Sequence, residues 1–142
     1  MKPLSFHVRA MTPADLPAST ALWSASEGVE LAEGDRPADL ERYLERNPGF
    51  SSVAVEGDQL IGAVLCGHDG RRGLVYHLAV RADRRGRGVG HALLQRSLAG
   101  LRAAGIRRAL LLVAADNASG QAFWLREGWE ELTFARPMGI DL

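Results

Sequence analysis

Three closely spaced glycines stand between a strand pattern and a helix pattern. Residues 74–80 form an apolar run typical of a strand, and residues 91–104 repeat apolar side chains with the period of a helix. Gly86, Gly88 and Gly90 lie between them, among arginines. Glycines leave backbone N–H groups bare, and the start of a helix carries a partial positive charge. The segment therefore predicts a loop that binds a phosphate group.

The remaining patterns predict an α/β (α+β) fold in which helices flank a mixed sheet. Proline and acidic residues mark the helix starts, and a Gly-Asp pair at residues 57–58 marks a hairpin. The run 109–115 is apolar throughout, as expected of a strand buried on both faces. We expect the order β-α-α-β-β-β-α-β-α-β. The predicted strands are residues 4–10, 51–56, 59–66, 74–81, 109–115 and 131–135, and the predicted helices are residues 12–26, 35–47, 91–104 and 119–127.

Length and composition favour one domain spanning residues 1–142. Seventeen basic residues balance seventeen acidic ones, so we expect neither a nucleic acid nor a membrane as partner. Cys66 is the only cysteine, which excludes an intramolecular disulfide and a cysteine-built zinc site and fits a reducing cytoplasm. No signal peptide or run of about 20 apolar residues is present, so we expect a soluble, complete chain.

Two common phosphate loops do not fit the glycine spacing. A dinucleotide-binding loop needs G-x-G-x-x-G near the first strand, but His91 stands at the third glycine position. The acid expected about twenty residues further on is replaced by Arg107 and Arg108. A Walker A loop needs a lysine, and Lys2 is the only lysine in the chain.

The glycine segment resembles the acetyl-coenzyme A signature of the GNAT superfamily of N-acetyltransferases, [Q/R]-x-x-G-x-[G/A] after an "LAV" strand. The matching residues are Leu78, Ala79 and Val80, then Arg85, Gly86, Arg87, Gly88, Val89 and Gly90. A second family pattern, N-x-x-[A/G]-x-x-F-[Y]-x-x-x-G-[F/W], follows at the expected distance. It is matched by Asn117, Gly120, Phe123, Trp124, Gly128 and Trp129.

The resemblance covers nearly the whole chain and implies the GNAT fold with acetyl-coenzyme A as co-substrate and no metal. It implies that the amides of residues 85–91, from Arg85 to His91, bind the pyrophosphate. The backbone of residues 78–80 would pair with the pantetheine arm, and Asn117 would contact the other side of that arm. Arg81, Arg84 and Arg87 are either 3′-phosphate ligands or a solvated charged face.

The chain departs from the family pattern at Trp124, where the usual residue is a tyrosine that protonates the leaving thiolate. An indole N–H donates a hydrogen bond, so we retain Trp124 as a cofactor contact, but it does not release a proton. Tyr76 is our first substitute, because strand periodicity places it on one face with Leu78 and Val80. His77 is the second catalytic candidate and points to the opposite face unless a bulge changes the register. The alternative for both Tyr76 and His77 is a side chain that packs in the fold and has no catalytic role.

Carboxylates crowd the segment between the first two helices, which in this family forms a wall of the acceptor site. We expect Glu27, Glu30 and Asp35 to bind the acceptor, with Glu33 nearby, although a solvated loop with helix-capping acids is the alternative. Negative charge there favours a cationic primary amine, as a small molecule or on a peptide.

The leading hypothesis is an N-acetyltransferase in which the amine attacks acetyl-coenzyme A directly in a ternary complex. The alternative is a sensor of the same fold that binds acyl-coenzyme A with little catalysis, which the missing tyrosine favours. A covalent route through Cys66 has no supporting His and Asp arrangement. The closing strand, with Leu132 and Phe134, would allow a homodimer as well as a monomer.

Overall fold

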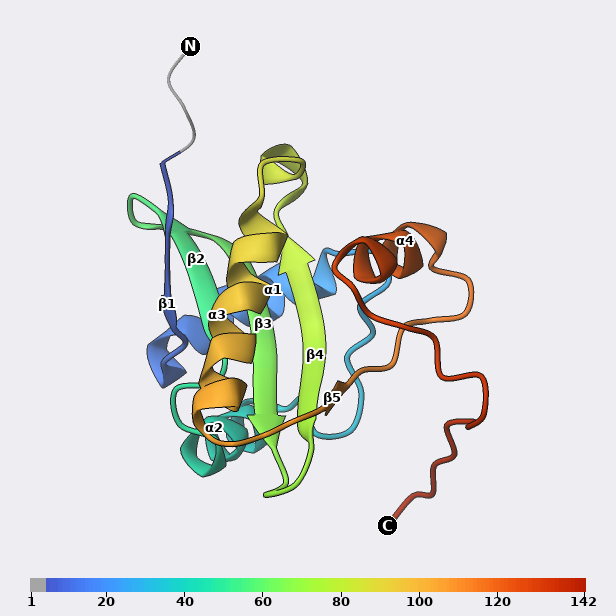
Figure 1. Ribbon diagram of the computed structural model, residues 1–142. Helices are drawn as coiled ribbons and strands as arrows, with labels where there is room; N and C mark the ends of the chain where they lie inside the picture. Colours follow the sequence, from blue (N-terminus) through green and yellow to red (C-terminus); the bar gives the residue numbers. More distant parts are fainter. Residues whose placement is uncertain (1–4) are drawn as a thin grey trace. The chain divides into compact units, whose positions relative to one another are not determined.

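The computed structural model describes residues 5–142 and divides into two compact units, one ending at Leu111 and one running from Leu112 to Leu142. Within the first unit, the described residues form a sheet with strand order β1-β2-β3-β4-β5 (Figure 1). All neighbouring pairs are antiparallel except β4 and β5, which are parallel. The strands are β1 (His7–Ala10), β2 (Ser52–Glu56), β3 (Gln59–His68), β4 (Gly73–Val80) and β5 (Ala109–Leu110).

Helices cover both faces of this sheet, with α3 on the near face in Figure 1 and α1 on the far face. The predicted first helix is a short 3-10 turn, η1, followed by α1, and a second 3-10 turn, η2, precedes α3. The bounds are η1 (Pro13–Asp15), α1 (Leu16–Ser24), α2 (Pro37–Arg46), η2 (Ala82–Arg84) and α3 (Val89–Ala103). The second unit contains α4 (Ala118–Arg126).

The main apolar core lies where α1 and α2 pack on the sheet. Trp23 of α1 is fully buried there, with Leu40 and Leu44 of α2. Ala63 and Leu65 of β3 supply the sheet side of this cluster. Alternate residues of β3 therefore face α1 and α2, while the residues between them face α3.

Small residues let α3 approach the other face of the sheet. A Cβ added at Gly62 would lie 2.8 Å from Leu93 Cδ1, and one added at Gly73 would lie 2.6 Å from Leu101 Cδ1. A buried hydrogen bond of 2.8 Å also joins the hydroxyls of Ser52 and Ser97. The sheet and α3 are consequently packed too closely to shift past one another, which fixes the position of the loop that precedes α3.

Two predicted strands differ from the structure. The ladder of β5 covers only residues 109–110, and Leu112 is 76% exposed, so residues 111–115 are not a strand buried on both faces. Residues 131–135 form no strand, and Phe134 is 84% exposed. Alternating apolar residues form a strand only where a neighbouring strand offers a backbone to pair with, and nothing in residues 5–142 pairs with this segment.

The other predicted elements are present with shifts of a few residues at their ends. Part of the first predicted strand, residue 4, lies outside the described residues. The hairpin at Gly57 is confirmed, since Glu56 pairs with Gln59 across it. In the part of the chain that the structure describes, we find no helix with the length and apolar character needed to cross a bilayer.

Candidate functional site

The glycine loop opens α3 in a conformation that requires glycine. Gly86 and Gly88 have φ angles of +75° and +82°, in the left-handed region, and Gly88 is the N-cap residue of α3. A Cβ built on either residue meets no other atom within 4 Å, so the space beside both is open. The first N–H groups of a helix have no partner within the helix. The loop therefore presents an open backbone surface of positive potential, which fits a diphosphate.

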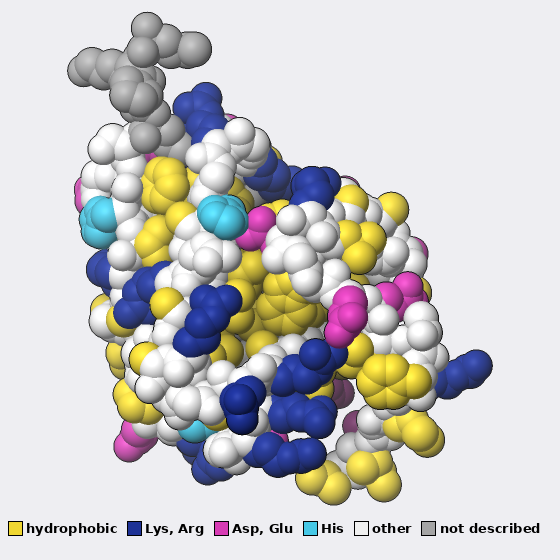
Figure 2. Space-filling model, viewed as in Figure 1, with side chains coloured by type: hydrophobic (Ala, Val, Ile, Leu, Met, Phe, Trp, Pro, Cys, Tyr) yellow, Lys and Arg dark blue, Asp and Glu magenta, His cyan; other side chains and the backbone are white. Residues whose placement is uncertain are grey.

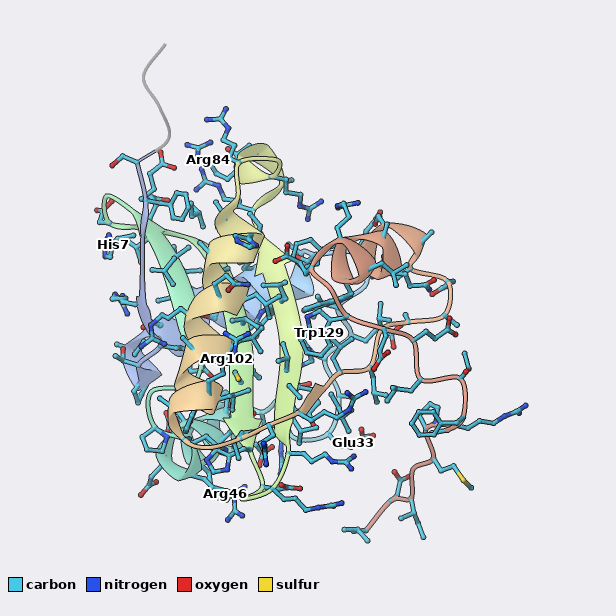
Figure 3. All side chains as sticks on the ribbon, in the orientation of Figure 1. His7, Glu33, Arg46, Arg84, Arg102 and Trp129 are labelled. Atoms are coloured by element: carbon cyan, nitrogen blue, oxygen red, sulfur yellow. The ribbon has the colours of Figure 1, made fainter. Side chains whose placement is uncertain are left out.

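Three arginines in and before this loop make local side-chain hydrogen bonds. Arg84, labelled in Figure 3, donates from Nε and Nη2 to the two carboxylate oxygens of Glu56, at 2.7 and 3.2 Å. That guanidinium lowers the pKa of Glu56 below its ordinary value. Arg81 donates to Asp83 in the same way, and Arg85 donates from Nε to the carbonyl of Val80 at 3.0 Å. Of the three arginines considered for the 3′-phosphate, Arg81 and Arg84 are thus engaged with carboxylates.

A second group of basic side chains lies at the opposite end of α3. Arg102, Arg107 and Arg108 line a hollow of about 110 Å³ there. In Figure 2, dark blue (Lys and Arg) side chains gather in the lower part of the view, near the end of α3. A helix of 15 residues is about 22 Å long, so this group is too far from Gly88 to belong to the glycine loop.

A bulge in β4 places Tyr76 and His77 on one face of the sheet. Ala79 pairs with Ala63 and Tyr76 pairs with Leu65, so two residues of β4 lie opposite one residue of β3. The extra residue is His77, whose φ of +55° is the only positive value outside glycine in residues 5–142. Simple alternation resumes only after it.

The bulge corrects the predicted face of Tyr76. It is also the change of register under which His77 was expected to leave the opposite face. Tyr76 contacts Tyr43 of α2, with ring centres 6.4 Å apart, and does not share its face with Leu78 and Val80. His77 contacts Trp23 of α1, with ring centres 5.3 Å apart. Both candidate side chains therefore face the layer of α1 and α2.

His77 is hydrogen-bonded to a carboxylate that we expected in the acceptor wall. Its Nε2 lies 2.8 Å from Asp35 Oδ1, and the two side chains are 16% and 12% exposed. The other oxygen of Asp35 accepts the N–H of Ala32 at 2.8 Å, while the N–H of Asp35 donates to the carbonyl of Ala32. Asp35 is thus held by a turn of its own segment and directed at His77.

Tyr76 stands at the edge of this site, with 37% of the residue exposed. Partial burial raises the pKa of its hydroxyl, so the group stays protonated at neutral pH. Burial also raises the pKa of Tyr43, whose hydroxyl oxygen has no hydrogen-bond partner among the described residues. Tyr43 lines an open hollow of about 330 Å³ with Gly34, Asp39, Arg42 and Arg46.

The predicted acceptor residues differ in their surroundings. Glu27 and Glu30 are exposed in the segment between α1 and α2, as expected of side chains available to a ligand. Asp35 lies in the same segment, and its side chain is hydrogen-bonded to His77. Sequence reasoning named both members of this pair without joining them, because they are 42 residues apart and no local pattern links them. A histidine at a strand bulge has no sequence signal of its own.

In the second unit, Asn117 caps α4. Its Oδ1 accepts the N–H of Gly120 at 3.0 Å, and a Cβ at Gly120 would overlap the Asn117 side chain. The spacing of asparagine and glycine in the second motif therefore has a local structural role. Trp124 packs between Phe123 and Trp129, with ring centres 5.1 and 5.2 Å away.

Comparisons with known proteins agree with this arrangement. The model of the acetyltransferase (GNAT) family matches residues 17–129. An acetyltransferase of Pectobacterium atrosepticum is 36% identical over 112 residues, covering 78% of this chain and 77% of that protein. An acetyltransferase of Yersinia enterocolitica is 34% identical, with the same coverage of 78% and 77%.

Solved structures share the fold at lower identity. Ard1 from Thermoplasma volcanium superposes with a TM-score of 0.77 at 20% identity, over 87% of this chain and 81% of that one. The PaiA N-acetyltransferase of Thermoplasma acidophilum, solved with coenzyme A, gives a TM-score of 0.73 at 16% identity, over 87% and 88%. The glycine loop, the flanked mixed sheet and the family match over most of the chain lead to one conclusion: the protein belongs to the GNAT family and is an N-acetyltransferase.

Proposed function

We propose that this enzyme transfers an acetyl group from acetyl-coenzyme A to a primary amine, by direct attack within a ternary complex. The observation that carries the proposal is the β4 bulge, which turns Tyr76 and His77 to one face a few residues before the glycine loop. A proton donor and a proton acceptor thus stand on the strand that leads to a phosphate-binding helix start. Direct transfer needs both.

The residues present fit the co-substrate. The amides of residues 85–91 offer donors for the diphosphate, and Gly86 and Gly88 leave room for it. The backbone of residues 78–80 is proposed to pair with the pantetheine arm. Asn117 and Trp124 of the second unit remain proposed contacts, as does His91 at the end of the loop.

The bound co-substrate would supply an acetyl thioester, whose carbon accepts the amine and whose sulfur leaves as a thiolate. Tyr76 is the proposed proton donor to that thiolate, because its raised pKa keeps the hydroxyl protonated until the sulfur needs a proton. This assigns to Tyr76 the role that Trp124 does not perform. Tyr76→Phe should lower kcat by at least tenfold while the Kd for acetyl-coenzyme A stays within about twofold.

The acceptor is proposed to be a small cationic amine or the amine of a peptide. Glu27 and Glu30 are exposed carboxylates in the segment that also carries Asp35, and they favour a positive charge. Glu30→Lys should raise KM for a diamine more than KM for a monoamine of similar size. Equal KM changes for both would reduce this segment to a solvated loop.

The defining experiment follows the release of coenzyme A thiol from acetyl-coenzyme A. The acceptor panel should contain a polyamine, an aminoglycoside and a peptide with a free N-terminus, each compared with its N-acetylated form. Thiol release that requires a free amine, with an acetylated product of the expected mass, supports the proposal. Binding of acetyl-coenzyme A without thiol release on any amine would instead favour the sensor hypothesis.

Three further expectations are retained as part of the proposal. They are a cytoplasmic location, a single functional domain over residues 1–142, and a monomeric or homodimeric state. The partner is the amine acceptor, with neither nucleic acid nor membrane involved. Sedimentation of the purified chain with and without acetyl-coenzyme A tests the oligomeric state.

A further inference from the structure

Asp35 and His77 form a contact that neither the glycine loop nor the acidic segment explains. Their side chains are mostly buried, and their nearest atoms, Oδ1 and Nε2, are 2.8 Å apart. Trp23 packs against the imidazole from α1, and Tyr76 stands beside it on β4 with ring centres 6.3 Å apart. The imidazole is thus enclosed on several sides in one orientation.

The hydrogen bond determines which imidazole nitrogen carries the hydrogen in the neutral ring. A carboxylate can only accept, so Nε2 of His77 must donate to Asp35. In the neutral ring the other nitrogen, Nδ1, then has a free lone pair and can accept a proton. The Ala32 N–H occupies the second oxygen of Asp35, which prevents the carboxylate from rotating away.

We infer that Asp35 is a positioning residue that makes Nδ1 of His77 the general base for the acceptor amine. The inference rests on the proposed function, direct acetyl transfer. In that step the amine nitrogen bonds to the acetyl carbon as the C–S bond breaks, and one amine proton passes to Nδ1. The thiolate takes the Tyr76 proton, and both side chains then exchange protons with solvent. Asp35 takes no proton, and it acts only by holding the ring and its tautomer.

The groups that face His77 support this division of roles. Asp35 approaches from the segment before α2, Tyr76 from β4, and Tyr43 of α2 lies behind Tyr76. Asp35 is the carboxylate within hydrogen-bond distance of Nε2. Burial raises the pKa of both tyrosines, so they stay protonated at neutral pH. Glu27 and Glu30 are exposed in the same segment, which leaves them free to meet the acceptor.

Asparagine at position 35 provides a specific test because Ala32 dictates the orientation of the amide. The Ala32 N–H needs an acceptor, so the oxygen of the new amide faces Ala32 and its NH₂ group faces His77. Nε2 must then accept, and the hydrogen moves to Nδ1. In Asp35→Asn the proposed base is therefore blocked without any loss of side-chain volume.

The first measurement is the tautomer of the neutral His77 ring by long-range ¹H–¹⁵N correlation NMR at alkaline pH. We expect the hydrogen on Nε2 in the wild type and on Nδ1 in Asp35→Asn. A wild-type hydrogen on Nδ1 overturns the inference. This readout requires no substrate, so it decides the orientation even if no amine is acetylated and the proposed function fails.

The second measurement is steady-state kinetics with the best acceptor amine. Asp35→Asn should lower kcat by at least about 100-fold, with the Kd for acetyl-coenzyme A within about twofold of wild type. Asp58→Asn, the same change in the exposed turn between β2 and β3, is the matched control and should stay within about twofold. A kcat within threefold of wild type in Asp35→Asn overturns the inference.

A double-mutant cycle separates positioning from a general structural role. His77→Asn suits the bulge because asparagine tolerates a positive φ. If Asp35 acts through His77, then adding Asp35→Asn to His77→Asn should change kcat by less than about twofold. A further large loss in the double variant shows that Asp35 acts by another route, which overturns the inference. Should Asp35→Asn fail to fold, the wild-type tautomer and the kcat of His77→Asn decide the question.

Discussion

Gly88→Ala should separate the two roles of the glycine loop, backbone conformation and phosphate binding. Gly88 has a φ of +82°, and a non-glycine residue in that region costs about 1–2 kcal/mol. The new Cβ meets no protein atom within 4 Å, so the substitution causes no internal clash. That open space is where the phosphate is proposed to bind. The variant should therefore lose about 1–2 kcal/mol of stability and also lose affinity for acetyl-coenzyme A.

The linkage between binding and stability makes the affinity loss measurable. At a free ligand concentration 100 times the wild-type Kd, acetyl-coenzyme A stabilises the folded wild type by about 2.7 kcal/mol. A tenfold weaker variant gains only about 1.4 kcal/mol at the same concentration. Denaturant unfolding with and without ligand, analysed at constant m-value, gives both numbers for each protein.

The other end of α3 supplies the matched control. Gly105 has a φ of +83°, and its added Cβ also meets nothing within 4 Å. Gly105→Ala should therefore show the same loss of stability without ligand but keep the full 2.7 kcal/mol of ligand stabilisation. The full ligand stabilisation of about 2.7 kcal/mol in both variants would refute the assignment of Gly88 to phosphate binding. The same reduction of ligand stabilisation in both variants would show that α3 stability, rather than the loop, controls the affinity.

Three more measurements test other parts of the structure. Burial raises the pKa of Cys66 to about 12, so above pH 9 the folded chain keeps the thiol proton while the unfolded chain loses it. The free energy of unfolding should therefore fall as the pH rises above 9, and it should fall less steeply in Cys66→Ala. Gly120→Ala should displace the Asn117 cap and lower the helix content of the second unit by circular dichroism, with a cost of about 1 kcal/mol. Glu56→Gln removes the carboxylate that anchors Arg84, so the Kd for acetyl-coenzyme A should rise severalfold, and an unchanged Kd would show that the loop holds its shape without this pair.

The conformation of the glycine loop could be predicted because its signal is local. Glycines between a strand and a helix require only the chain's own backbone to adopt the conformation, and Gly86 and Gly88 have the expected positive φ angles. The proline and acidic residue that mark the first helix start are another local signal: Pro13 and Asp15 lie in η1, and the side chain of Asp15 accepts the Thr12 N–H. The element order was predicted except for its last strand.

The missed features depend on contacts that sequence spacing does not encode. The β4 bulge is visible only in the pairing of Tyr76 with Leu65, which involves another strand. The prediction of a closing strand around Phe134 was wrong for a related reason, because no strand within residues 5–142 pairs with this segment. The hydrogen bond between Asp35 and His77 was not predicted, because the two residues lie far apart along the chain.

The bulge and the Asp35 contact are best understood together, because the conformational cost of the bulge and the stabilisation from the hydrogen bond are of similar size. A non-glycine residue with a positive φ costs about 1–3 kcal/mol, and His77 has a φ of +55°. A hydrogen bond to a charged group contributes about 1.5–3 kcal/mol, so the bond that His77 donates to Asp35 is large enough to hold the strained residue. Trp23 adds packing on the same ring. If the bond is what holds the bulge, then the strain at His77 is tolerated because it turns the imidazole toward the layer of α1 and α2, where a carboxylate can set its tautomer.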